Sequence, residues 1–321
     1  MANIICGVDV GAKTLDAGIG RDGAWRRFDN TEAGIGELAS FCQAHKVDLV
    51  VMEASGGYER LAFGLLWAAG IQAALANPRA VRRFAQAMGT LEKTDRIDCA
   101  MIAWYAETKR LKPQPPASAT QQRLTALVLR LRQLTELQVA QKNQSRLVSE
   151  PEVRETFSAV LQTLAAQMRT LQDKIVAIID ADPLWAALDK AFREIKGVAG
   201  RTVARLIADL PEVGTVSGKA VAKLNGVAPI ADDSGQRNGK REVRGGRESV
   251  RSILYMVAMV VKRHDPDFKA FYETLKSKGK PHNVIRIALA RKLLVRLNAK
   301  ARDVRRALAV GSMPARQTEV A

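Results

Sequence analysis

The sequence predicts an α/β domain followed by a basic region that is helical throughout. Two short apolar segments, residues 4–10 and 47–53, each contain one carboxylate, as is typical of buried strands that present a functional acid. Strand and helix patterns alternate up to residue 112, and helical periodicity dominates after it. These observations indicate a mixed sheet domain at the N-terminal end and a second, mainly helical part.

The first part has strand and helix signals in a recognisable order. Strands are predicted at residues 4–10, 14–19, 25–28, 47–53 and 71–76. Helices are predicted from Thr31 to Ala44, from the turn at 55–57 to Leu65, from Arg79 to Met88, and after Thr94. Three antiparallel strands followed by alternating helix and strand is the order of a ribonuclease-H-like sheet.

The last of these helices carries two carboxylates in its first turn. Thr94 is a plausible N-cap, and Asp95 and Asp98 lie three residues apart, which places both on one helix face. Two carboxylates held so close repel each other unless a proton or a cation lies between them. An acidic first turn that only favours the helix dipole is the alternative interpretation.

The isolated carboxylates of the two strands favour a metal site. Asp9 lies within the first strand and Glu53 ends the fourth, and the carboxyl ends of neighbouring parallel strands open onto one crevice. A helix over that edge would bring Asp95 and Asp98 to them. Four hard oxygen ligands suit two Mg²⁺ ions, with Mn²⁺ as a substitute. Two such ions roughly 4 Å apart stabilise phosphoryl transfer. A hydrogen-bonded core carboxylate is the alternative for each strand acid.

Charge indicates a polyanionic partner. The 321 residues include 50 Lys and Arg against 33 Asp and Glu, a net charge of +17. Residues 237–306 alone contain 20 Lys and Arg against 6 Asp and Glu. Three cysteines and three histidines show no disulfide or zinc spacing. No signal peptide or bilayer-spanning run is found, so we expect a cytoplasmic protein without a membrane partner.

A Pro-rich linker at 113–118 precedes two long helical stretches. Their apolar residues follow heptad spacing. The seams are Leu124, Leu127, Leu131 and Leu134 in one stretch, and Phe157, Leu161, Leu164, Met168, Leu171, Ile175 and Ile178 in the other. An antiparallel coiled-coil hairpin, a dimer seam and two helices of an ordinary bundle all fit this pattern.

The region 183–309 is predicted to be a basic helical domain, followed by a disordered tail at 310–321. Gly197 and Gly200 suggest a helix-hairpin-helix-like turn whose backbone N–H groups meet a phosphate, with a plain helix–helix turn as the alternative. Residues 234–247 are rich in glycine and basic side chains, which is typical of a mobile loop along a phosphate backbone. Ser234 beside Gly235 is a candidate nucleophile towards phosphorus, although most loop serines are turn residues.

Nine residues are predicted to contact nucleic acid because they are basic or allow close backbone approach. They are Lys93, Gly197, Gly200, Arg237, Lys240, Arg241, Arg244, Arg247 and Arg251.

Three groups of motifs carry a family resemblance. They are Gly7-Val8-Asp9 with Met52-Glu53-Ala54-Ser55-Gly56, then Lys93-Thr94-Asp95-Arg96-Ile97-Asp98-Cys99, then Asn225-Gly226-Val227-Ala228-Pro229 with Ser234-Gly235. In this order they resemble the DEDD-type transposases of bacterial insertion sequences, relatives of the pilin-gene-inverting recombinase. The chain departs from that pattern at Val243, where the family often has Ser or Thr.

The resemblance implies a RuvC-like DEDD domain at 1–112, a linker and coiled-coil helices at 113–182, and a transposase domain at 183–309. It implies that Asp9, Glu53, Asp95 and Asp98 hold Mg²⁺ and that Ser234 attacks DNA to give a phosphoserine intermediate. It further implies a nucleoid-associated homo-oligomer, a dimer or tetramer, with a composite site across subunits. Donor and target DNA would be chosen by an RNA that the element encodes.

Three other classes compete with this interpretation. A Holliday-junction-resolvase-like nuclease would use the same four acids with water as nucleophile. An actin-like ATPase shares the opening at 7–11 but needs a second copy of that fold, which the helical second part does not offer. A non-catalytic nucleic-acid-binding module would explain the charge and leave the four acids without a role.

Overall fold

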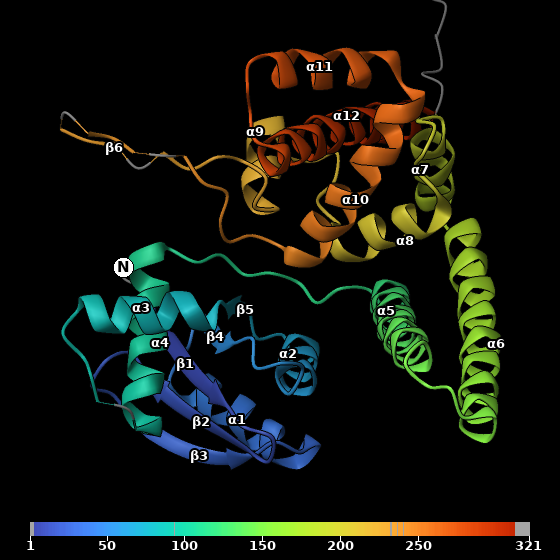
Figure 1. The fold of residues 1–321 in the computed structure, drawn as a ribbon. Helices are drawn as coiled ribbons and strands as arrows, with labels where there is room; N and C mark the ends of the chain where they lie inside the picture. Colours follow the sequence, from blue (N-terminus) through green and yellow to red (C-terminus); the bar gives the residue numbers. More distant parts are fainter. Residues whose placement is uncertain (1–2, 93, 232, 236, 240, 312–321) are drawn as a thin grey trace, which may run out of the picture. The chain divides into compact units, whose positions relative to one another are not determined.

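A computed structural model describes residues 3–92, 94–231, 233–235, 237–239 and 241–311 of the chain. The chain divides into two compact units, Met1–Ser118 and Ala119–Ala321. Each unit has buried apolar residues of its own, so each has a separate core. Figure 1 labels most of the elements of both units.

The first unit contains a five-stranded mixed sheet in the order β3-β2-β1-β4-β5. The strands are β1 (Ile5–Val10), β2 (Thr14–Ile19), β3 (Trp25–Asp29), β4 (Leu49–Glu53) and β5 (Ala73–Ala76). Strands β1, β2 and β3 pair antiparallel, and β4 and β5 extend the sheet in parallel. This topology confirms the ribonuclease-H-like α/β fold class. Strands β4 and β5 begin slightly later than predicted.

Helices cover both faces of this sheet. They are α1 (Glu32–Ala44), α2 (Glu59–Ala68), α3 (Pro78–Ala87) and α4 (Asp95–Lys109). Thr31 and Thr94 cap α1 and α4 as predicted, since each side chain accepts a hydrogen bond from a first-turn N–H at 3.3 Å. One core lies between the sheet and α1 with α2, and the other between the sheet and α3 with α4.

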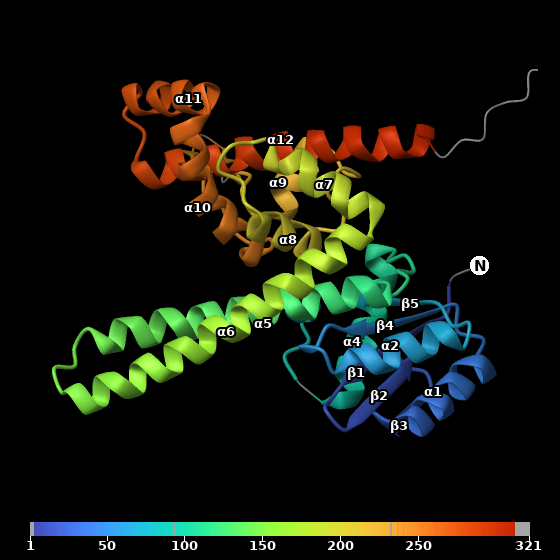
Figure 2. The same ribbon diagram turned by 90° about the vertical axis from the view of Figure 1, so that its right-hand side faces the viewer.

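A helical hairpin opens the second unit. It consists of α5 (Ala119–Ser145) and α6 (Pro151–Ala181), which run side by side in opposite directions (Figure 2). Leu131, Leu134, Met168 and Ile175 of the predicted seams are buried there. The hairpin alternative is therefore confirmed within one chain, because these residues find partners on the neighbouring helix.

The rest of the second unit is helical around one core. Its helices are α7 (Pro183–Arg193), α8 (Gly200–Asp209), α9 (Gly218–Leu224), α10 (Glu248–His264), α11 (Pro266–Ser277) and α12 (His282–Gly311). Buried Phe192, Leu206, Phe268 and Leu293 belong to that core. Helix α12 continues to Gly311, into the segment predicted as a tail, and residues 312–321 lie outside the described part.

None of the helices that the structure describes is long and apolar enough to cross a membrane.

Candidate active site

Four charged side chains form a row across the sheet of the first unit. Strand pairing sets Asp9 of β1 opposite Asp16 of β2, and Asp16 opposite Arg27 of β3. On the other side of β1, Val8 pairs with Met52 of β4, so the next residues, Asp9 and Glu53, are also lateral neighbours. Residues directly opposite in paired strands share a sheet face. The predicted acids Asp9 and Glu53 therefore lie beside each other on one face.

Helix α4 packs against this same face at very short range. A Cβ atom on Gly7 would lie 2.1 Å from the Cys99 carbonyl oxygen, and one on Gly18 would lie 3.1 Å from the Cys99 Cβ. Gly7 is two residues before Asp9 and shares its sheet face. The missing side chains at both glycines let the first half of α4 cross directly over β1 and β2. Asp95 and Asp98 belong to that half of the helix.

The pKa of the buried Cys99 thiol is affected by the carboxylates around it. Its Sγ donates a hydrogen bond to the Asp16 carbonyl oxygen at 2.9 Å. Burial, reinforced by the negative charges of Asp9, Asp16 and Asp98, raises the pKa of this thiol to about 12. Three carboxylates from β1, β2 and α4 are thus close enough to act on one buried sulfur. At neutral pH Cys99 stays protonated, which excludes it as a thiolate nucleophile.

Arg27 connects the sheet to the start of α4. Its Nε donates to Asp16 Oδ1 at 2.9 Å, and its terminal nitrogen donates to Asp95. The Asp16 side chain is nearly buried, whereas those of Arg27 and Asp95 are about half exposed. The hydrogen bond with Asp16, followed by the charges of Asp16 and Asp95, raises the pKa of Arg27. The guanidinium is therefore a permanent cation between two carboxylates.

The donor set on this face fits a divalent ion. Carboxylate oxygens are the ligands that Mg²⁺ and Mn²⁺ prefer, and β1, β4 and α4 supply Asp9, Glu53, Asp95 and Asp98. Within the described residues, no three or more His, Cys, Asp or Glu side chains are arranged so that they could hold a metal. The Asp95 carboxylate instead contacts Arg27. The convergence of all four acids on metal ions therefore stays a prediction.

The loop after Glu53 is held by a buried carboxylate. At the predicted turn, Glu59 Oε2 accepts hydrogen bonds from the N–H groups of Ser55 at 3.0 Å and Gly57 at 2.9 Å. Gly56 and Gly57 have φ values of +73° and +118°, which glycine adopts without strain. Glu59 therefore fixes the segment that follows the end of β4.

Ser234 lies on a short arm of the second unit. The arm pairs β6 (Asp233–Ser234) with β7 (Arg237–Asn238), and a bridge joins Ile230 to Glu242 at its base. Part of the predicted loop thus forms a small hairpin, in which Gly235 turns the chain with φ of +53°. The Ser234 side chain is exposed. An exposed hydroxyl at a hairpin turn is accessible to a macromolecular substrate.

The predicted basic contacts around this arm differ in their surroundings. Arg241 pairs with Asp233 at 3.6 Å, and Arg244 is exposed. Arg247 donates to both carboxylate oxygens of Glu212 at 2.6 Å, and Arg251 donates to the Gly245 carbonyl oxygen at 2.5 Å. The last two arginines therefore also fix the end of the arm segment to the helical core. Lys93, Lys240 and the Arg237 side chain lie outside the described part.

The glycine turn between α7 and α8 has a structural role. Gly197 has φ of +101°, and a Cβ there would lie 3.1 Å from the Val261 backbone nitrogen of α10. Gly200 is the first residue of α8. Close packing on α10 is sufficient reason for glycine at 197, so contact with a phosphate at this turn stays a prediction.

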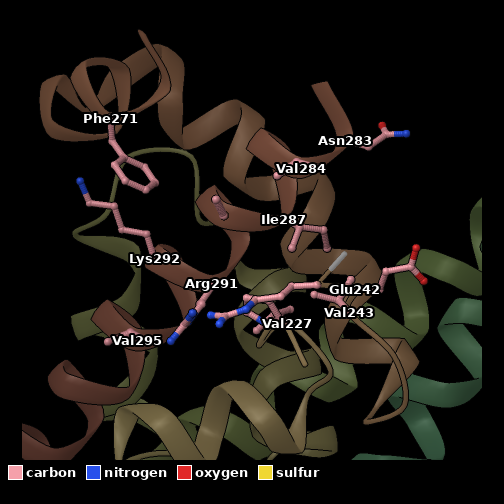
Figure 3. Close-up of a pocket in the computed structure, with 13 residues that line it drawn as sticks. Val227, Glu242, Val243, Phe271, Asn283, Val284, Ile287, Arg291, Lys292 and Val295 are labelled. Atoms are coloured by element: carbon pink, nitrogen blue, oxygen red, sulfur yellow. The ribbon is translucent and has the colours of Figure 1, made fainter. Parts of the chain in front are cut away.

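A cavity of about 670 Å³ lies beside the base of the arm (Figure 3). Apolar side chains of α11 and α12, among them Phe271 and Ile287, line it together with Val243 of the arm segment. Arg291 and Lys292 of α12 also line it. The arm thus adjoins an apolar hollow with basic residues beside it.

Asp16, Arg27 and Glu59 have roles that sequence reasoning missed. Asp16 interrupts an otherwise apolar strand, as Asp9 does, and that signal was available in the sequence. Its partner Arg27 could be recognised only from the register between β2 and β3, which depends on the length of the connecting turn.

Comparisons with known proteins agree on one family. Residues 6–148 match a DEDD-type IS110 domain described as Transposase, and residues 189–273 match one described as Transposase IS116/IS110/IS902 family. The pilin gene-inverting proteins of Moraxella lacunata and Moraxella bovis are each 27% identical over 315 residues, covering 92% of this chain and 94% of theirs.

Two further similarities cover only part of the chain. An insertion element IS110 protein of Streptomyces coelicolor is 27% identical over 150 residues, which is 46% of this chain and 36% of that protein. A Thermus thermophilus RuvC structure aligns with a TM-score of 0.25 and 15% identity, covering 35% of this chain and 99% of its own. With two successive domain matches and relatives aligned over nearly its whole length, the chain belongs to the DEDD-type, IS110-like family of insertion-sequence transposases and recombinases.

Proposed function

We propose that this protein cuts and rejoins DNA strands of an insertion sequence, using Mg²⁺ at the acids of the first unit and Ser234 of the second as nucleophile. The observation that carries the proposal is the row on the sheet, where Asp9 and Glu53 are lateral neighbours beneath the helix that bears Asp95 and Asp98. Family membership supports strand exchange as the overall reaction.

The acids of the first unit would hold the metal ions. Bound Mg²⁺ supplies a Lewis acid that polarises the scissile phosphate and stabilises charge on its oxygens. Asp9 and Glu53 are suited to this because strand pairing fixes their backbones side by side. Asp95 and Asp98 approach from α4, whose position is set by the contact with Gly7. Rigid elements therefore present every proposed ligand.

Ser234 would make the covalent link. Its Oγ attacks phosphorus, the bond from phosphorus to the 3′ oxygen breaks, and that oxygen leaves as a 3′-hydroxyl after taking up the proton that the serine lost. The 5′ phosphate stays on Ser234 as a phosphodiester. Attack by a 3′-hydroxyl of the exchanged strand then reverses the step and reseals the backbone. No bond is lost to water, so the reaction needs no ATP.

The basic residues of the second unit would bind nucleic acid. Residues 237–306 hold most of the net positive charge, and the cations around the arm sit on the segment that carries Ser234. Lys and Arg provide affinity for phosphates through counterion release. We include in the proposal a guide RNA encoded by the element, with donor and target DNA as substrates and a homo-oligomer as the active form.

The test is a Ser234→Ala variant incubated with labelled element-end DNA, Mg²⁺ and RNA from the element. We expect wild-type protein to give a covalent protein–DNA band on a denaturing gel and the variant to give none. Binding of DNA and RNA by the variant should be nearly unchanged, because Ser234 is exposed and makes no contribution to the core.

Ser158→Ala on α6 is the matched control, since Ser158 is also exposed. It should form the covalent band at the wild-type level. An adduct formed by Ser234→Ala would remove Ser234 from the mechanism. Cleavage by the wild type without any adduct would instead indicate a nuclease that uses water.

A further inference from the structure

We propose that Arg27 is a positioning residue that neutralises Asp95 in the metal-free protein and competes with divalent ions for that carboxylate. The inference rests on the proposed function, which makes Asp95 a metal ligand. It assigns a role to two residues, Arg27 and Asp16, that lie beside the proposed ligands.

Asp16 fixes Arg27 in place. The Asp16 carboxylate is only 6% exposed and lies opposite Asp9 in the strand register, so it needs a cation nearby. Arg27 provides that charge through its Nε at 2.9 Å. A planar guanidinium can bind a second carboxylate with its remaining nitrogens, which a point-charge ammonium does less well. One nitrogen of Arg27 accordingly donates to Asp95.

Asp95 can exchange partners at low cost. Its side chain is 53% exposed and lies in the first turn of α4, whose cap is provided by Thr94 and not by Asp95. Ion pairs between exposed side chains are weak, so a multivalent ion can replace the guanidinium. The Asp95 carboxylate cannot use the same oxygens to bind both the Arg27 guanidinium and a divalent ion. Metal binding would therefore transfer Asp95 from Arg27 to the metal, while Arg27 stays on Asp16.

The adjacent Arg26 offers a matched control. It lies on the same strand, is similarly exposed, and pairs with Glu37 of α1 at 2.7 Å. Successive strand residues point to opposite faces, so Arg26 is on the face away from Asp9 and Arg27. Removing its charge changes the net charge by the same amount without touching Asp95.

The experiment measures binding of Mn²⁺ alone to the full-length protein, without DNA, by the loss of the free-ion EPR signal. Arg27→Gln should bind Mn²⁺ roughly two- to fivefold more tightly than wild type, the range for loss of one competing exposed ion pair. Arg26→Gln should bind as wild type does. In an Asp95→Asn background, Arg27→Gln should have no further effect, since the competing pair is already lost.

Two results together would overturn this inference and leave the proposed metal site intact. Folded Arg27→Gln would bind Mn²⁺ no more tightly than wild type, and Asp9→Asn would abolish the binding seen in wild type. Absence of Mn²⁺ binding in both wild type and Arg27→Gln would overturn the metal site itself. If Arg27→Gln does not fold, Arg27→Lys replaces it. The lysine keeps the charge near Asp16 but bridges poorly, so a smaller gain in affinity supports the inference and no gain contradicts it.

Discussion

The acids and the serine are presented by very different structures. Asp9 and Glu53 lie on paired strands of a sheet whose two faces are both covered by helices. Helix α4 packs directly against the backbone of β1 at Gly7. Ser234 sits on an exposed arm with two residues in each strand. The first arrangement suits metal ligands, which must be held rigidly. The second suits a nucleophile that must reach a large substrate and form a bond with it.

The largest effect on activity is expected when one of the four proposed metal ligands is changed. Asp98→Asn should lower Mg²⁺-dependent DNA cleavage at least about a hundredfold, because the amide is a poor ligand for a hard cation. The fold should be retained, since the replacement has the same shape. Cleavage assays at saturating Mg²⁺ test this.

The exposed Asp22, in the turn between β2 and β3, provides the control. Asp22→Asn should cleave at the wild-type rate. Full activity of Asp98→Asn would contradict the assignment of this carboxylate to the metal.

Substituting glycine should destabilise the protein more on the sheet of the first unit than on the arm of the second. Gly7→Ala should lower the free energy of unfolding by about 3 kcal/mol or prevent folding, because the new Cβ would overlap the Cys99 carbonyl oxygen. Gly235→Ala on the arm places its Cβ in open space. It should lower the free energy of unfolding only by the cost of a positive φ, roughly 1 kcal/mol. Denaturant unfolding of both variants measures the difference.

Gly36→Ala, in α1 with open space around it, should be neutral or stabilising by up to about 1 kcal/mol. Equal losses for Gly7→Ala and Gly235→Ala would show that α4 does not pack on β1 as described.

The smallest effect is expected at Glu212, which ties the arm segment to the core. Burial acts to raise its pKa, but the hydrogen bonds and charge of Arg247 outweigh burial and lower the pKa below the usual 4.5. A lowered pKa contributes stability above the unfolded-state value, and that stability is lost as the pH falls through the folded-state value. The contribution should be only about 0.5 kcal/mol, because the pair is partly exposed.

Thermal unfolding of wild type and Arg247→Gln between about pH 7 and about pH 3 checks this expectation. The variant should lose less stability than wild type as the pH falls below about 4.5. Parallel curves for the two proteins would show that the pair contributes nothing.

Local signals in the sequence predicted most of the fold. Thr31 and Thr94 marked two helix starts correctly because an N-cap acts within one helical turn. The strand acids Asp9 and Glu53 were recognised because a carboxylate in an apolar run is costly without a partner. Such effects depend on neighbours in the chain, which a sequence displays directly.

The missed features depend on contacts between distant residues. The pairing of Asp16 with Arg27 follows from the strand register, and the link to Asp95 spans 68 positions. The arm that carries Ser234 looked like a loop because its strands have two residues each, too few for a period-two pattern. The heptad seams of α5 and α6 did not distinguish a hairpin from a dimer, because both bury the same stripe.

The most direct test of the account is mass spectrometry of the peptide that contains Ser234, after reaction of wild-type protein with DNA and Mg²⁺ and digestion by nuclease and protease. Wild type should carry a nucleotide linked through phosphate to Ser234, and Asp98→Asn should carry none. Cleaved DNA with an unmodified Ser234 peptide in the wild type would contradict it.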